Sequence, residues 1–268
     1  MERQETLSSS EQEQQERLAK ALQSFPDKIT EDQLDWLEGY RLYEALRNLP
    51  PNVLNVSGRF LYSDISTLKP GKIYLLGYNP GGKPDEHPSL RNEIRQWFSK
   101  NDNAYLDEEW RGFQKGQAPL QQRVKALLNA IGIKPEDVCA SNLFFVRSER
   151  EEEMSKIIKD ILNKSPEGSF NCHFQSVHKA MIDIVKPGCI IAFGLTTYRI
   201  IKKLFHSTCE STFPSHYKHR GKDLDYKIAE RIQIKIIGLP HLSHYDPRNY
   251  HDVLQKIKEE CQTASTKS

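Results

Sequence analysis

Four short apolar runs, rich in β-branched and aromatic residues, divide the chain, and segments of helical period separate them. The runs cover residues 73–76, 138–146, 189–193 and 232–237. The helical segments include residues 123–131, 174–185 and 198–204. Strands that alternate with helices predict a parallel sheet with helices on both faces. We therefore expect an α/β fold of three layers, α-β-α, with a central four-stranded, mainly parallel sheet.

The remaining segments predict one domain with short ends. The 268 residues are enough for one large α/β domain with a substantial core. Residues 1–25 are rich in Gln, Glu and Ser, which predicts a frayed or helical appendage with little core of its own. A helical pattern over residues 249–260 predicts the last helix, before a tail of residues 263–268. We therefore expect a single domain over residues 26–262.

Composition excludes some classes of protein. No run of about 18 apolar residues occurs, so we expect no membrane span. The five cysteines are scattered without a closely spaced pair, which argues against a disulfide framework, a zinc site or an iron–sulfur cluster. We expect reduced thiols, an intracellular location (cytoplasmic, or nuclear in a eukaryote), no metal and no cofactor.

The distribution of charge along the chain is only weak evidence for a nucleic-acid partner. The formal net charge is only +2, so the overall balance indicates no particular partner. Basic residues gather between positions 199 and 222, and they include Lys218 and Arg220. Such a stretch is compatible with phosphate binding, although a solvated helix face produces the same pattern.

The chemistry-bearing residues follow the predicted strands. In parallel sheets, ligands bind outside the carboxyl ends of the strands. The first run is followed by Gly77-Tyr78-Asn79-Pro80-Gly81. Glycine lets the backbone approach a ligand, proline fixes the turn, and an Asn amide held there can orient a water molecule. An ordinary Asn-Pro-Gly turn is the alternative interpretation.

Two further polar groups stand at equivalent places. Asn142 lies inside the second apolar run, where its amide must find hydrogen-bond partners, either in the neighbouring backbone or in a ligand. His241-Leu242-Ser243 follows the fourth run. A histidine there can donate a hydrogen bond to a leaving group that becomes an anion. A polar surface loop is the alternative.

In their order and spacing, these three motifs resemble those of the uracil-DNA glycosylase superfamily, over about residues 70 to 250. In that family a GxDP or GxNPG loop follows the first strand, a strand-borne Asn recognises the base, and an HPS-type loop follows the last strand. The resemblance implies a monofunctional DNA glycosylase, which hydrolyses the N-glycosidic bond of a flipped-out base and leaves an abasic site.

The resemblance also implies roles for individual residues. Asn79 would place the attacking water, Asn142 would bind the pairing edge of the base, and His241 would donate to O2 of the leaving base. The substrate pocket would comprise Gly77, Tyr78, Pro80, Gly81, Phe98, Asn142 and Ser243, with Phe98 stacked on the base. The motifs contain no lysine for a Schiff base, so we expect no lyase step.

The expected partner is single- or double-stranded DNA, bound by a monomer. His244, Tyr245 and Arg248, just beyond the last motif, could supply a wedge into the duplex and a phosphate contact, with Lys218 and Arg220 as further contacts. Residues 83–118 form the main irregular insertion. Two interpretations fit it: a surface excursion held by its aromatic residues, or a lid or DNA-facing loop.

The motifs depart from the family pattern at two places. Leu242 replaces the usual proline of the last motif, so the loop can differ in shape. Asn79 stands where the most efficient uracil-removing family has Asp, and this matches the mismatch-specific and single-strand-selective branches. A neutral amide cannot take a proton from water, so we expect slower chemistry than an Asp would give.

The substrate is the point at which alternatives stay open. Members strict for uracil place a tyrosine just after the proline of the first motif, where it excludes groups on C5. This chain has Gly81 there, which favours a C5-modified pyrimidine and a role in defence against phage DNA; repair of plain uracil is the other possibility. A non-catalytic DNA- or abasic-site-binding protein of the same fold, and an unrelated α/β hydrolase or transferase acting on a free nucleoside, are the competing classes.

Overall fold

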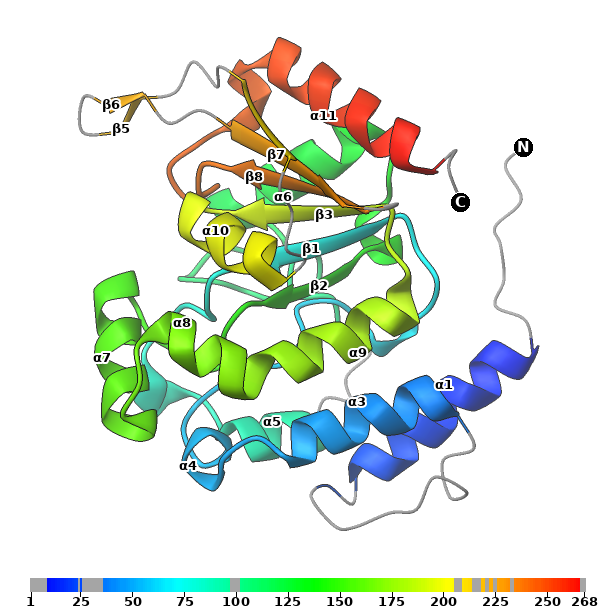
Figure 1. Ribbon diagram of the computed structural model, residues 1–268, viewed down its shortest axis with the longest axis vertical. Helices are drawn as coiled ribbons and strands as arrows, with labels where there is room; N and C mark the ends of the chain where they lie inside the picture. Colours follow the sequence, from blue (N-terminus) through cyan, green and yellow to red (C-terminus); the bar gives the residue numbers. More distant parts are fainter. Residues whose placement is uncertain are drawn as a thin grey trace.

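The computed structural model describes residues 9–23, 25, 36–96, 102–204, 209–213, 218–219, 222–223, 226–231 and 234–265. Its centre is a six-stranded sheet in the order β2-β1-β3-β8-β7-β4 (Figure 1). These strands are β1 (Ile73–Gly77), β2 (Cys139–Asn142), β3 (Cys189–Phe193), β4 (Cys209–Phe213), β7 (Tyr226–Arg231) and β8 (Ile234–Leu239). A separate small hairpin pairs β5 (Lys218–His219) with β6 (Lys222–Asp223).

The four strands β1, β2, β3 and β8 are mutually parallel, which confirms the expected fold class. β1 pairs with β2 on one side and with β3 on the other, so the strand order reverses there. Such a reversal opens a crevice at the carboxyl ends of the strands. The antiparallel extension by β7 and β4 was not predicted, because its charged and polar residues hide the strand pattern.

Helices cover both faces of the sheet (Figure 1). One face carries α9 (Gln175–Val185), α10 (Leu195–Leu204) and, outside α9, α3 (Leu37–Arg47). The opposite face carries α6 (Pro119–Ile131) and α11 (His251–Ser265). Alternation along β1 sends Tyr74 and Leu76 into the first core and Ile73 and Leu75 into the second.

The N-terminal helix is more firmly attached than its composition predicted. In α1 (Ser9–Gln23), Leu18 and Leu22 are fully buried in the first core, together with Phe25 beyond the helix. The ring of Phe25 packs edge-on against Tyr43 at 5.9 Å between centroids. The expected helix is thus present over residues 9–23, and it adds Leu18 and Leu22 to the first core because its apolar residues recur on one face among the many polar ones.

The insertion after β1 is tied into both cores. It contains the 3-10 turn η2 (Pro84–Glu86) and α5 (Leu90–Gln96), which buries Leu90 and Ile94 in the first core. Farther along, Tyr105 is buried in the second core. The segment is thus packed structure rather than a free excursion; Trp97 and Phe98 lie outside the described residues.

The remaining elements are short or peripheral. They are α4 (Pro51–Leu54), α7 (Glu151–Leu162), α8 (Pro166–Ser169), the π-helical turn η5 (Phe170–Phe174), and the 3-10 turns η1 (Ile65–Thr67), η4 (Pro135–Asp137) and η6 (Pro247–Asn249). Proline begins α4, α6 and α8, where the missing N–H costs nothing. Among the described residues, no helix combines the length and apolarity that a bilayer crossing needs.

Candidate active site

The three sequence motifs meet at one edge of the sheet. β1, β2, β3 and β8 run in the same direction, so the residues that follow them gather at their common carboxyl edge. Gly77 and Asn142 are register partners at the ends of β1 and β2. A Cβ at Gly77 would overlap the Asn142 side-chain oxygen. Glycine is therefore required at this position, because the Asn142 amide lies across the β1 backbone.

The Asn142 side chain is buried without full hydrogen bonding. The residue is 6% exposed, and its Nδ2 has no hydrogen-bond partner among the described residues. Leaving a buried donor unsatisfied costs about 1–3 kcal/mol. A donor held in this state at the crevice of a parallel sheet is suited to a ligand that supplies an acceptor.

Asn79 is oriented by acceptors. Its Nδ2 donates to the Ser148 carbonyl at 3.1 Å, to Ser148 Oγ at 2.9 Å and to the Pro80 carbonyl at 2.9 Å. The two carbonyl oxygens can only accept, so the amide nitrogen must face them. The Asn79 Oδ1 then points away from Ser148 as an acceptor for another group.

Ser148, which the sequence motifs did not predict as a site residue, holds the Asn79 amide in this orientation. Its N–H donates to the Pro80 carbonyl at 3.0 Å, and its Oγ donates to the Arg150 carbonyl at 2.9 Å. Because that hydroxyl proton is used, Ser148 Oγ accepts from Asn79. No motif marks Ser148, which lies in the loop between β2 and α7, so only the tertiary structure identifies it.

The other residues of the first motif differ in their environments. The Tyr78 side chain lies in the first core, edge-on to Phe144 at 5.3 Å, and burial raises its pKa to about 12. Alternation along the strand turns it away from the Gly77 face, so its predicted pocket role is wrong for the side chain. Pro80 is buried, whereas Gly81 is exposed.

His241 is held as one neutral tautomer. The Ser243 N–H donates to His241 Nδ1 at 3.1 Å, and Ser243 Oγ lies 2.7 Å from the same nitrogen. Since Nδ1 accepts, the proton resides on Nε2, which can donate. Burial, aided by the nearby His244, lowers the pKa of His241 to about 4. A neutral imidazole with a fixed Nε2 donor results at neutral pH.

The His241 loop is pinned from α6. The Arg123 Nη1 donates to the carbonyl oxygens of Leu242 at 2.8 Å and Ser243 at 2.6 Å, and its Nε lies 3.5 Å from an Asp246 oxygen. Leu242 is fully buried in the second core. The buried Leu242 side chain and the hydrogen bonds from Arg123 together fix this loop.

The start of α10 lies beside His241. Gly194 joins β3 to α10 with φ of 89°, and a Cβ there would lie 3.8 Å from His241 Cδ2. Positive φ favours glycine. The amino end of α10, which carries partial positive charge, is thus next to the imidazole.

The residues of the last loop that were predicted to contact DNA differ in their exposure. His244 is exposed, and Arg248 is exposed but forms a two-point ion pair with Asp246 at 2.6 and 2.9 Å. Tyr245 is fully buried and stacks on Tyr250 at 4.9 Å, so the expectation that it forms a wedge is wrong in this structure. The Tyr245 ring is instead packed in the second hydrophobic core.

The basic β5–β6 hairpin projects from the edge that carries the site (Figure 1). β4 is antiparallel to β7, which is antiparallel to β8, so β4 ends at the same edge as β8. Lys218 begins this hairpin in β5, whereas Arg220, like Phe98, lies outside the described residues. The topology therefore places the β5 backbone, with position 218, at the carboxyl edge of the sheet, and the DNA contact of Lys218 stays a prediction.

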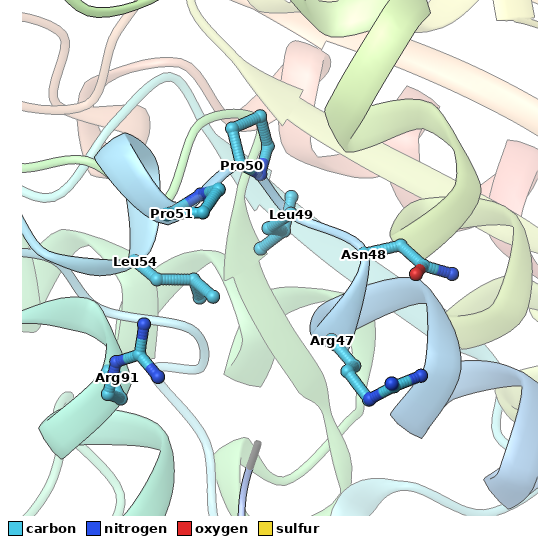
Figure 2. Close-up of a pocket in the computed structure, with 7 residues that line it drawn as sticks. All are labelled: Arg47, Asn48, Leu49, Pro50, Pro51, Leu54 and Arg91. Atoms are coloured by element: carbon cyan, nitrogen blue, oxygen red, sulfur yellow. The ribbon is translucent and has the colours of Figure 1, made fainter. Parts of the chain in front are cut away.

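A groove of about 380 Å³ lies elsewhere, where α3, α4 and α5 meet (Figure 2). Its lining consists of Arg47, Asn48, Leu49, Pro50, Pro51, Leu54 and Arg91. None of the motif residues lines this groove, and its side chains include no general acid or base that would titrate near neutral pH. We therefore place the candidate chemistry at the sheet edge.

Comparison with known proteins identifies no relative: no protein-family model and no curated protein matches the chain. Within the described residues, no group of three or more His, Cys, Asp or Glu side chains is placed to hold a metal ion. The site is therefore interpreted from its own residues.

Proposed function

We propose that this chain is a monofunctional DNA glycosylase that hydrolyses the N-glycosidic bond of a flipped-out uracil or C5-modified pyrimidine. The observation that carries the proposal is the Asn142 amide, which is buried at the carboxyl edge and whose Nδ2 has no hydrogen-bond partner among the described residues. An amide offers one donor and one acceptor side by side, which matches the pairing edge of a pyrimidine. A flipped base would supply the missing partner.

Water activation is assigned to Asn79. Its nitrogen is occupied by Ser148 and Pro80, so its Oδ1 is the atom that would accept a hydrogen bond from the attacking water. The amide orients this water but does not remove its proton. Bond cleavage therefore runs ahead of water attack, with positive charge building on the sugar.

Leaving-group stabilisation is assigned to His241. The fixed Nε2 donor would bind O2 of the departing base as it becomes an anion. A neutral, preorganised donor of this kind typically contributes about 100- to 1000-fold in rate. The amino end of α10 beside Gly194 adds favourable potential for the same anion.

DNA would approach from the carboxyl edge of the sheet. The β5–β6 hairpin, with Lys218 and Lys222, would contact phosphates beside the flipped nucleotide. His244, an exposed residue of the last loop, would contact the strand. Arg248 needs to exchange Asp246 for a phosphate to do so.

The test is base release from short oligonucleotides that carry uracil, 5-hydroxymethyluracil, hydroxymethylcytosine or its glucosylated form. Single- and double-stranded forms are compared, and abasic sites are revealed by alkaline cleavage. We expect release of at least one base, lost in Asn79→Ala and His241→Ala. The preferred base separates repair of uracil from defence against modified phage DNA.

Two outcomes would contradict the proposal. Absence of release from every substrate, together with tight binding to DNA that contains an abasic site, would identify a non-catalytic binding protein. Release of a base from free nucleosides, with no need for polymeric DNA, would instead identify a nucleoside hydrolase.

A further inference from the structure

The wall of the site next to Gly81 is open. A Cβ added at Gly81 would meet no atom within 4 Å. At Gly82, with φ of 99°, a Cβ would lie 3.1 Å from His87 Nε2 and 3.4 Å from Arg147 Nη1. The first polar groups beyond this glycine pair are therefore an imidazole and a guanidinium.

Arg147 is buried beside this wall with incomplete pairing. It is 7% exposed, its Nη1 donates to the Gly81 carbonyl, and its Nε has no hydrogen-bond partner among the described residues. No described carboxylate lies within ion-pair distance of it. Glu108 is instead paired with Arg59 at 2.5 and 2.8 Å.

A buried guanidinium without a paired carboxylate is costly to maintain. Burial, the largest cause, lowers the pKa of Arg147 together with the positive charge of Arg59, whereas the nearby Glu93 and Glu108 offset only part of this effect. Such a group gains most from a ligand that brings oxygen acceptors, which the planar guanidinium can bind at two points. His87 adds a second polar group on the same side of Gly82.

We propose that Arg147, with His87 beside it, is a specificity subsite for an oxygen-bearing substituent on C5 of the flipped pyrimidine. This inference rests on the proposed glycosylase function, and it assigns the substrate class within it. The absence of a side chain at Gly81 would let the substituent pass, and Arg147, beside Gly82, would supply its hydrogen-bond donors. A backbone phosphate of the flipped nucleotide offers the same acceptor chemistry, so the experiment separates these two sources.

The experiment measures kcat/KM on single-stranded oligonucleotides that carry uracil or 5-hydroxymethyluracil, for the unmodified protein, Arg147→Met and Arg147→Lys. The matched control is Arg150→Met, an exposed arginine three positions farther along. We expect Arg147→Met to lower the ratio of 5-hydroxymethyluracil to uracil activity at least about tenfold, since a site that hydrogen-bonds a substrate group discriminates strongly. The control keeps the ratio unchanged.

Equal loss of activity on both substrates, which leaves the ratio unchanged, would overturn the inference in favour of a phosphate contact, and undiminished activity on both substrates would overturn it outright. Thermal unfolding of each variant verifies folding, and Arg147→Lys, which keeps the charge, should retain part of the preference. Binding is measured separately with non-hydrolysable 2′-fluoroarabino analogues of both nucleotides. If the hydrolysable oligonucleotides release no base, but the hydroxymethyl analogue binds preferentially and Arg147→Met loses that preference, the glycosylase proposal is contradicted and the subsite is sustained. Equal binding of both analogues would overturn the subsite.

Discussion

The hydrogen bonds of the Asn79 amide determine which side chains position 79 can accept. Its nitrogen faces the carbonyl oxygens of Pro80 and Ser148, neither of which can donate. A carboxylate in the same place would bring a negative oxygen against both carbonyls. An aspartate at position 79 could therefore not keep the orientation that Asn79 has in this loop.

Asn79→Asp tests this consequence. We expect turnover at pH 8 to fall at least about tenfold, because the carboxylate must either rotate away or become protonated. Since the carbonyls raise the pKa of the introduced acid, part of the activity should return as the pH is lowered. Initial rates of base release across pH measure this. A variant faster than the unmodified protein at neutral pH would contradict the assigned orientation.

The His241 pKa predicts the shape of the pH profile. Its value of about 4 keeps the imidazole neutral above about pH 5, so activity should not change through the usual histidine range near pH 6.5. Below about pH 5, His241 Nδ1 becomes protonated and can no longer accept the hydrogen bond from the Ser243 N–H. Single-turnover rates of the unmodified protein between pH 5 and 8 provide the measurement, and a clear inflection at pH 6 to 7 would refute it.

Among the secondary-structure elements, α6 has a role beyond core packing, since Arg123 holds the His241 loop. Arg123→Met should lower turnover about 10- to 100-fold, because a displaced catalytic group loses much of its effect. Lys125→Met is the matched control: Lys125 lies on the same helix and also donates to a backbone carbonyl, that of Gly116. Equal effects of the two variants on turnover would argue against a positioning role for Arg123.

The sequence patterns predicted the parallel strands and their helices but not the antiparallel strands. The four parallel strands and their flanking helices carry strong apolar patterns, and the prediction of each is confirmed within a few residues. β7 and β4 are missed because polar residues at this sheet edge weaken the pattern. In the site, Asn79, Asn142 and His241 are marked by their positions after strands. Ser148, Arg123 and Arg147 act through tertiary contacts, which no local spacing reveals.

For the whole molecule, one buried histidine links stability to pH. His178 lies between the Tyr74 hydroxyl at 2.9 Å and the Leu143 carbonyl at 3.0 Å, so its Nε2 donates and its Nδ1 accepts. Burial lowers the pKa of His178 to about 4. Because the unfolded chain binds a proton near pH 6.5 and the folded one does not, stability is full above that pH and declines as pH falls toward 4.

His178→Gln removes this contribution. Between pH 7 and pH 5 the unmodified protein should lose about 2 kcal/mol more unfolding free energy than the variant, from the difference between pKa values of about 6.5 and 4. Urea unfolding at the two pH values measures the difference, and His241 is present in both proteins. Parallel losses of stability would show that His178 does not carry the linkage.

The most direct test of the account is to follow the oxygen atom that enters the product. The reaction is run on a pyrimidine-modified oligonucleotide in water enriched in the heavy oxygen isotope, and the base and the abasic strand are analysed by mass spectrometry. Glycosidic hydrolysis that depends on Asn79 predicts an unlabelled free base and an abasic strand, and Asn79→Ala should form neither product. A strand that retains its pyrimidine, or a label found in the free base, would contradict glycosidic hydrolysis by this protein.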